Sequence, residues 1–380
     1  MIEDRLSSRR TWSPPRWASW LLIIPSAIVG ILLVELLCRL FVPSIAERPD
    51  ANWWERRVMF FDGAGTIFQN RGDIFTYVPN SEIRGLTAYF SAHDYTIEYD
   101  YRFRTNNFGL VQDADLVPGQ DSLLLLGDSF TEGQGADPWF RLARPAIEKL
   151  GYQAVNGGVI GTGFEQWLRL EQYLSAQDIR VRKLLVLFIS DDYHRAVWNV
   201  QPPVRDCLSD ISHCDLNQSL FYRLPPIQQL ASWIATIRAA RMPPAKKVSL
   251  ESRARTLLPA SYQVYDALNR RLRAPKASPQ EERPQEERSH AAIATLIRIY
   301  GPQNVAFLHL PQKDEAAGPW EEGLRARRAI EGTGGKLYYG FKLCGLTPAD
   351  YYRIDSHPNH NGYAKIAACA VDVINQLATR

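Results

Sequence analysis

The sequence predicts an α/β fold in which a mainly parallel sheet is covered by helices on both faces. Three short apolar runs support this prediction: Ser122–Leu126, Leu184–Ile189 and Asn304–Leu310. Runs of this kind are typical of strands that are buried on both sides. Segments with helical patterns lie between them, and strands that alternate with helices favour a parallel sheet.

Capping and breaking residues predict where the helices and strands between these runs begin and end. Asp137 followed by Pro138 is typical of a helix start, and Gly151 ends that helix. A strand is then expected at 152–155 and a helix at 164–174. These elements continue the alternation that begins with the first apolar run.

The C-terminal part of the chain repeats the same alternation. A helix is expected at 290–300, directly before the third apolar run, and a helix of about 17 residues closes the chain. The apolar residues of the last helix recur at helical spacing and predict one buried stripe: Ile366, Ala370, Ile374 and Leu377.

Residues 17–42 are predicted to form a single transmembrane anchor. No charged residue occurs from Trp17 to Val34, and with Leu36–Cys38 the stretch reaches the ~20 residues that span a bilayer. A cleaved signal peptide is the alternative, although its apolar region would be only about 7–15 residues long. Arginines precede the helix and few basic residues closely follow it. The positive-inside rule therefore predicts a cytoplasmic tail at 1–16 and places the rest on the periplasmic, extracytoplasmic side of the cytoplasmic membrane.

Two further segments lie outside the alternating pattern. Residues 45–115 are an N-terminal extension, in which 95–104 alternates as a strand does. The remaining chain, 116–380, is predicted to be one α/β domain that carries an insertion at 200–289.

The insertion is expected to hold helical segments and a loop. The helical segments are predicted at about 218–240 and 248–273. The run 274–289 nearly duplicates Pro-Gln-Glu-Glu-Arg and is rich in Pro and charge, which favours a mobile loop.

Composition argues against some classes of function. The formal net charge is only +3, so no nucleic acid partner is expected. No spacing of Cys, His and acidic residues indicates a metal site, and no cofactor is predicted. Of the five cysteines, Cys38 lies in the predicted anchor. Cys207 and Cys214 could bridge in an oxidising compartment, and Cys344 and Cys369 could form a second bridge or remain two buried thiols.

A candidate nucleophile follows the first apolar run. In open α/β sheets, functional sites form at the carboxyl ends of the strands, and this strand ends in Gly127-Asp128-Ser129. The glycine allows a sharp turn that would expose the next side chains, which suits Ser129 as a nucleophile. The same residue types also occur in ordinary caps and turns, so the motif alone is weak.

A base and a carboxylate for such a nucleophile occur just before the last helix. A serine hydroxyl needs a base to take its proton, and the base needs a carboxylate that fixes its tautomer and stabilises the imidazolium. His357 and Asp355 lie two residues apart and are predicted to fill these roles. The alternative is a helix N-terminus capped by Asn359 or Asn361 with a surface histidine.

With both elements, the chain resembles the SGNH/GDSL hydrolase superfamily. It is similar to the membrane-anchored members that process acyl groups on cell-envelope polysaccharides. The nucleophile block matches at Gly127-Asp128-Ser129, and the glycine whose N–H helps to form the oxyanion hole matches at Gly161. The last block matches at Asp355 and His357, although the Asp often stands three residues before the His in the family.

The third block of the family is where this chain departs from the pattern. The family usually has an Asn whose amide donates to the oxyanion, and Asp191 takes that position. A missing donor costs ~10²–10³ in rate, and an ionised carboxylate ~4 Å from the oxyanion would add about 4 kcal/mol of repulsion. Three explanations stay open. Asp191 could be protonated, it could pair with Arg195 while Ser190 or a backbone N–H donates, or the enzyme could be weak or inactive.

The resemblance covers about 105–195 and 300–378 and implies a three-layer α/β/α fold with a mainly parallel, flavodoxin-like sheet. It implies a serine-dependent esterase that acts on O-acyl groups of cell-envelope glycan or another ester. The oxyanion would be held by the N–H groups of Ser129 and Gly161 and by a donor near Asp191. An O-acyltransferase of exported polysaccharide is one alternative, and a non-catalytic envelope scaffold or glycan-binding protein is another. No substrate-binding residue can be assigned.

Four other residues have polar side chains near these motifs in the sequence. Glu132 is expected to line or cap the turn after Ser129, and His194 and His309 are expected to be structural or on the surface. His360 is a candidate substrate contact only by its proximity in the sequence to the last motif.

Overall fold

The protein is described by a computed structural model that covers residues 16–41, 56–62, 67–71, 74–90, 95–136, 139–195, 227–239, 258, 261, 265, 279–315 and 318–378. The chain divides into two compact units. One consists of Met1–Pro49 and Ala245–Ala274, and the other of Asp50–Pro244 and Pro275–Arg380.

The first unit contains the helix α1 (Arg16–Phe41). Its Glu35 is buried and accepts a hydrogen bond of 2.8 Å from the backbone N–H of Ser261. Among the described residues, no helix combines the length and the apolar character that crossing a membrane requires. The predicted transmembrane anchor at 17–42 is therefore not supported.

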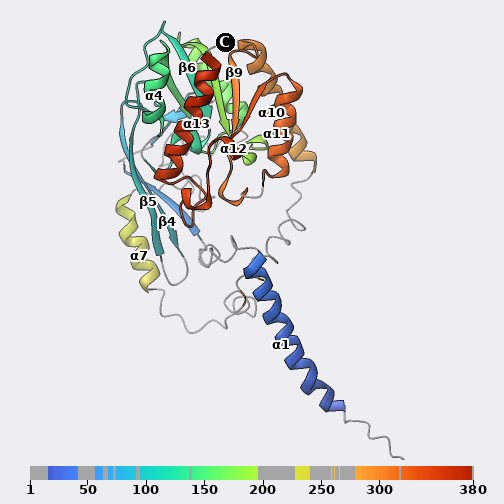
Figure 1. The fold of residues 1–380 in the computed structure, drawn as a ribbon. Helices are drawn as coiled ribbons and strands as arrows, with labels where there is room; N and C mark the ends of the chain where they lie inside the picture. Colours follow the sequence, from blue (N-terminus) through green and yellow to red (C-terminus); the bar gives the residue numbers. More distant parts are fainter. Residues whose placement is uncertain are drawn as a thin grey trace, which may run out of the picture. The chain divides into compact units, whose positions relative to one another are not determined.

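The second unit contains a parallel sheet of five strands (Figure 1). Its strands are β6 (Asp121–Gly127), β7 (Gln153–Gly158), β8 (Arg180–Phe188), β9 (Val305–His309) and β10 (Lys336–Tyr339). They lie in the order β10-β9-β8-β6-β7, and every neighbouring pair is parallel. The chain direction along the sheet therefore reverses at β6, next to β8, as in doubly wound sheets. The predicted parallel sheet is confirmed.

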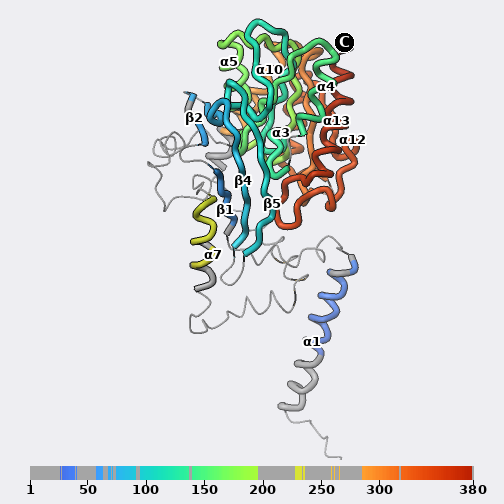
Figure 2. Tube along the Cα trace, turned by 90° about the vertical axis from the view of Figure 1, so that its left-hand side faces the viewer, coloured from blue at the N-terminus to red at the C-terminus, as the bar shows by residue number. Residues whose placement is uncertain are grey.

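Helices cover both faces of this sheet (Figures 1 and 2). On one face lie α4 (Phe140–Lys149) and α13 (His360–Ala378), and on the other lie α5 (Phe164–Ala176), α10 (Pro279–Tyr300) and α11 (Glu321–Gly332). Successive residues of a strand point to opposite faces, so Leu123 and Leu125 pack with the first pair of helices and Leu124 and Leu126 with the other three. The predicted stripe of the last helix is buried along its whole length.

The prediction of a mobile loop at 274–289 is wrong from Pro279 onward. The helix α10 begins at Pro279, eleven residues before the predicted start at 290. Pro is favoured at the first position of a helix, and Glu, Gln and Arg are good helix formers. Ser289 is fully buried, and Glu286 pairs with Arg325 of α11 at 2.8 Å. Packing and ion pairs therefore stabilise a segment whose composition alone favoured a loop.

The rest of the insertion is described only in part. Short helices occur at η4 (Ile227–Gln229) and α7 (Leu230–Ala239), within the predicted helical segment 218–240. The predicted segment 248–273, apart from three single residues, and the Cys207–Cys214 pair lie outside the described residues.

A second, antiparallel sheet is built from the N-terminal extension. It consists of β1 (Arg56–Phe61), β4 (Glu82–Phe90) and β5 (Tyr95–Arg104) in the order β1-β4-β5, which confirms the strand predicted at 95–104. A small ribbon of β2 (Phe68–Asn70) and β3 (Phe75–Tyr77) accompanies it. One face of the sheet joins the core of the five-stranded sheet through Ile83, Tyr99 and Phe103, and the other packs against Ile227 and Leu230.

One disulfide is present among the described cysteines. Cys344, which follows the short helix α12 (Gly340–Leu343), is bonded to Cys369 of α13, with the two Cα atoms 5.1 Å apart. The two alternatives left open for this pair are thereby decided in favour of a bridge. Cys38 is a free cysteine.

Candidate active site

The predicted site residues follow the carboxyl ends of neighbouring strands. Ser129 opens the short helix α3 (Ser129–Glu132) directly after β6, and Gly161 lies after β7. Asp191 lies in the 3₁₀ turn η1 (Ser190–Tyr193) after β8. These are the strands on either side of the point where the chain direction along the sheet reverses, where ligand sites of open α/β sheets form.

Local contacts fix the turn that carries Ser129. Asp128 is the N-cap of α3 and accepts a hydrogen bond of 2.9 Å from the Phe130 N–H. A Cβ on Gly127 would overlap Thr131 Oγ1 and would lie 2.5 Å from the carbonyl oxygen of Leu187. The glycine is thus required by the close approach of α3 and β8 rather than by a backbone conformation that only glycine adopts.

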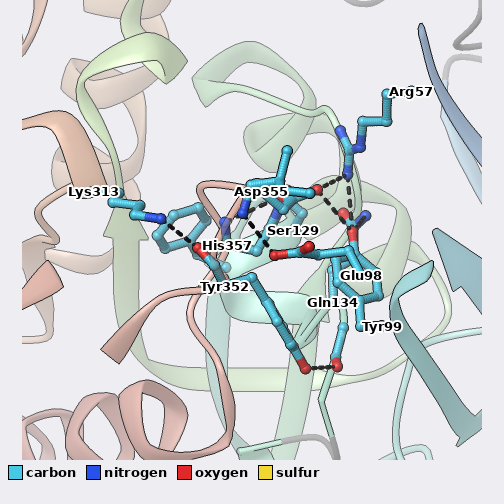
Figure 3. A network of polar contacts seen from close by, with 12 residues as sticks. Arg57, Glu98, Tyr99, Ser129, Gln134, Lys313, Tyr352, Asp355 and His357 are labelled. Atoms are coloured by element: carbon cyan, nitrogen blue, oxygen red, sulfur yellow. Dashed lines mark hydrogen bonds and ion pairs between the residues drawn. The ribbon is translucent and has the colours of Figure 1, made fainter. Parts of the chain in front are cut away.

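Ser129, His357 and Asp355 form one chain of hydrogen bonds, although His357 lies 228 residues after Ser129 (Figure 3). The Ser129 Oγ lies 2.8 Å from His357 Nε2, and His357 Nδ1 is hydrogen-bonded to Asp355 Oδ1. A carboxylate can only accept, so the histidine carries its proton on Nδ1 and leaves Nε2 free to accept from Ser129. The three groups are therefore arranged as nucleophile, base and orienting carboxylate.

Asp355 is buried and makes several polar contacts. Its second oxygen, Oδ2, accepts hydrogen bonds from Tyr89 OH at 2.8 Å and Tyr99 OH at 3.3 Å, and lies 3.0 Å from Arg57 Nη2. Burial alone would raise the pKa of Asp355, but the charges of His357 and Arg57 and the hydrogen bonds from His357 outweigh it and hold the pKa well below its usual range. Asp355 is therefore ionised at neutral pH.

The loop that carries Asp355 and His357 is held from two sides (Figure 3). Glu98 of β5 accepts a hydrogen bond of 2.7 Å from the Ile354 N–H. Lys313, in the 3₁₀ turn η5 (Lys313–Glu315), donates to the carbonyl oxygens of Tyr352 at 2.5 Å and Arg353 at 2.6 Å. These contacts fix the loop without a regular element of its own.

Two backbone donors are available for an oxyanion. Within the described part of the chain, neither the Ser129 N–H nor the Gly161 N–H has a hydrogen-bond acceptor. Gly161 has φ +71°, a conformation that favours glycine. Its neighbour Ile160 donates to Glu132 Oε2 at 2.7 Å, so the carboxyl group of α3 holds the loop of Gly161 close to the nucleophile turn.

Glu132 thus does more than cap its turn. It is buried, and its other oxygen accepts a hydrogen bond of 2.9 Å from Tyr77 OH of β3. Burial raises the pKa of Glu132 to about 8, although the bonds from Tyr77 and Ile160 act in the opposite direction. The group is therefore mainly protonated at neutral pH.

Asp191 is half-exposed and its Oδ2 accepts a hydrogen bond of 3.2 Å from Gln312 Nε2. Arg195 is 3.9 Å from the same oxygen, but it lies closer to Asp128 at 3.0 Å and to Asp192 at 2.9 Å. Of the three explanations for Asp191, this arrangement agrees best with pairing to Arg195. Gln312 is nevertheless a nearer partner of Asp191 than Arg195 is.

Ser190 does not supply the missing oxyanion donor. It is fully buried and donates its hydroxyl proton to Glu315, while its oxygen lies 3.2 Å from His309 Nε2. Arg327 Nε donates to His309 Nδ1 at 2.8 Å, so the proton of this imidazole is on Nε2 and points at Ser190. This second serine–histidine pair has the opposite polarity to the first, because its histidine donates toward the serine and cannot take its proton.

The other candidates contribute little to the site. His309 belongs to the buried network of Ser190, and burial and the charge of Arg327 lower its pKa well below the usual range. His194 ends η1 and is half-buried, and His360 is exposed at the start of α13. Within the described residues, no group of three or more His, Cys, Asp and Glu side chains is placed to hold a metal ion.

Sequence reasoning missed the residues of the antiparallel sheet that contact Asp355. Arg57, Tyr89 and Tyr99 come from three different strands, and Tyr89 precedes Asp355 by 266 residues. Alternation predicted only one of these strands, and nothing in its pattern indicates which side chain reaches a distant loop.

Comparison with known proteins gives weak likenesses only. No family model and no curated protein matches the chain. A crystal structure from Lactobacillus plantarum, a structural genomics target, is similar over 68% of this chain and 98% of that chain, with 12% identity and a TM-score of 0.34. LAE5, an alpha/beta hydrolase enzyme from the metagenome of Lake Arreo in Spain, is similar over 69% of this chain and 98% of that chain, with 13% identity and a TM-score of 0.34. Likenesses of this strength assign neither a fold nor an activity to this chain.

Proposed function

We propose that the protein is an SGNH/GDSL-type serine esterase. The observation that carries the proposal is the hydrogen-bonded chain from Ser129 through His357 to Asp355, with 2.8 Å between the hydroxyl and the accepting ring nitrogen. The serine follows the first strand of the parallel sheet, and the histidine precedes the last helix.

The proposed reaction is acyl transfer through an acyl-enzyme. His357 Nε2 takes the proton from Ser129 as its Oγ attacks the ester carbonyl carbon. The N–H groups of Ser129 and Gly161 stabilise the negative charge on the carbonyl oxygen. The imidazolium, paired with Asp355, then gives its proton to the departing alcohol. Water attacks the acyl-enzyme in the same way and releases the carboxylic acid.

The proposed substrate class is an O-acylated glycan of the cell envelope, outside the cytoplasmic membrane. The arginine-rich N-terminus supports an extracytoplasmic location through the positive-inside rule. The Cys344–Cys369 disulfide also favours an oxidising compartment. Attachment to the membrane through 17–42 stays a prediction from the sequence alone, and fractionation of cells that express the full chain tests it.

The function is tested with an activated acetyl ester and a serine-directed phosphonate. Wild type should hydrolyse the ester and become labelled, and Ser129→Ala should do neither. Ser190→Ala is the matched control, because it removes the serine of the other serine–histidine pair and should leave labelling intact. A wild type that is neither active nor labelled would favour a non-catalytic scaffold. Acetyl transfer to an oligosaccharide in excess over hydrolysis would favour the acyltransferase.

A further inference from the structure

We propose that Arg57 of the antiparallel sheet is a positioning residue of the active site, which keeps Asp355 ionised and fixed while His357 is neutral. This inference rests on the proposed function and adds the N-terminal extension to the catalytic machinery. Arg57 acts through Asp355 and has no contact with the reacting atoms in the proposed mechanism.

The two oxygens of Asp355 have separate tasks. Oδ1 binds His357 twice, through the ring Nδ1 and through the backbone N–H at 3.0 Å. Oδ2 is turned to the antiparallel sheet and contacts Tyr89, Tyr99 and Arg57. The catalytic pair therefore uses one oxygen, and the sheet holds the other.

The position of Arg57 is itself fixed from the nucleophile turn (Figure 3). Its Nη2 donates to Tyr99 OH at 3.0 Å, and Tyr99 OH also accepts from Gln134 Nε2 at 2.8 Å. Gln134 follows Gly133, the C-cap of α3, and its carbonyl oxygen accepts from Tyr363 OH of α13 at 2.9 Å. The contacts thus join β1, β5, the turn after Ser129 and the loop of Asp355.

A charge is needed at this place because the resting site would otherwise hold an unbalanced buried anion. Asp355 is 3% exposed. The proposed mechanism starts with a neutral His357, so the histidine supplies no positive charge before proton transfer. The phenols of Tyr89 and Tyr99 donate hydrogen bonds but carry no charge. Among the described residues, Arg57 is the cation within ion-pair distance of Asp355 in that state.

Loss of Arg57 should therefore favour a protonated Asp355 at neutral pH. A neutral carboxylic acid stabilises the imidazolium less, so the rate falls. As the pH rises, Asp355 should lose its proton and activity should return. The groups that face Asp355 and take part in this balance come from every neighbouring element: Arg57 on β1, Tyr89 on β4, Tyr99 and Tyr101 on β5, and Tyr352 and His357 beside it in the same loop.

The test measures kcat, KM and their pH dependence with an activated acetyl ester, for the full chain and its variants. Arg57→Met should lose about 10²-fold in kcat at pH 7, with KM within about threefold of wild type. The acidic limb of its kcat–pH profile should move to higher pH by about one unit or more. Arg57→Lys keeps the charge and should stay within about tenfold of wild type. Arg84→Met is the matched control, because it removes an arginine of the same sheet that pairs with the half-exposed Asp100.

Three outcomes would overturn the inference. Arg57→Met could be as active as wild type, it could lose the same factor at every pH, or Arg57→Lys could be as poor as Arg57→Met. If Arg57→Met does not fold, Arg57→Lys and Tyr89→Phe decide. Tyr89→Phe keeps the charge of Arg57, so it should leave the acidic limb of the kcat–pH profile in place.

The labelling experiment separates the inference from the proposed function. A wild type that shows no Ser129-dependent labelling would reject the proposed function itself, and the inference with it. A labelled wild type with an equally labelled Arg57→Met would reject the inference alone.

Discussion

Replacement of Glu132 with Gln should change how the stability of the protein depends on pH. The carboxyl group is buried between Tyr77 and the Ile160 N–H, and its pKa rises from 4.5 to about 8 on folding. Below pH 4.5 both the folded and the unfolded chain hold the proton, so this group has no effect. Between pH 4.5 and 8 the unfolded chain releases the proton and the folded one keeps it, so the free energy of unfolding falls as the pH rises.

The size of the effect follows from the shift. One pKa unit corresponds to about 1.4 kcal/mol, so the carboxyl group should cost about 5 kcal/mol of stability by pH 8 relative to pH 4. Glutamine has nearly the same shape but cannot ionise. Its carbonyl oxygen accepts from Ile160, and its amide donates to Tyr77 OH, which reverses the hydrogen bond that Tyr77 donates in wild type. Glu132→Gln should therefore match wild type near pH 4 to 5 and become progressively more stable than wild type toward pH 8.

Urea unfolding at intervals from pH 4 to 9 measures this difference. Other titrating groups are present in both proteins and cancel in the comparison. Glu82→Gln, at a glutamate whose side chain is 59% exposed, is the matched control and should show no such trend. Parallel stability curves for wild type and Glu132→Gln would refute the reasoning, because they would mean that Glu132 has the same proton affinity in both states.

Three further predictions concern neighbouring features. Asp191→Asn should change kcat on an activated ester by less than about tenfold, because the carboxylate is half-exposed and turned to other partners; a gain of 10² or more, the value of an oxyanion donor, would place this side chain in the oxyanion hole. Ser190→Ala should keep phosphonate labelling but lose about 1–3 kcal/mol in urea unfolding, since it leaves the buried Nε2–H of His309 without an acceptor, and unchanged stability would contradict this. Replacement of Cys344 and Cys369 with Ser should cost about 3 kcal/mol of unfolding free energy, as expected for a bridge that spans 25 residues, and an equal midpoint with and without the bridge would oppose it.

The sequence predicted the strands of the parallel sheet well because each is buried on both faces. Leu123–Leu126 and Leu184–Leu187 are fully buried, so nearly every residue of those runs had to be apolar. The strand β10 escaped notice because it lies at the edge and its four residues are half-buried or exposed. The first turns of α10, at 279–289, were mistaken for a loop because they pack against partners elsewhere in the chain. The composition of the segment does not reveal those partners.

The grouping of Ser129, His357 and Asp355 was also predictable, from the residue types and order of the two motifs, one after the first parallel strand and one before the last helix. What could not be predicted was how Asp355 keeps its charge. That depends on Arg57 and two tyrosines whose strands carry no motif. It required knowing that the antiparallel sheet packs its polar side chains against the loop before α13.

The two buried carboxyl groups near Ser129 illustrate this dependence. Glu132 and Asp355 each accept a hydrogen bond from a tyrosine of the N-terminal extension and one from a backbone N–H. Burial raises the pKa of both groups. At Asp355 it is outweighed by His357 and Arg57, whereas Glu132 has no cation beside it among the described residues to offset burial, and the neighbouring Asp128 adds to the rise. The two pKa values therefore suit two different roles: neutral Glu132 holds the loop of Gly161, and ionised Asp355 orients the base His357. Because both tyrosines and Arg57 come from residues 57–89, the α/β domain without its extension would keep the three site residues but lose what sets their charges.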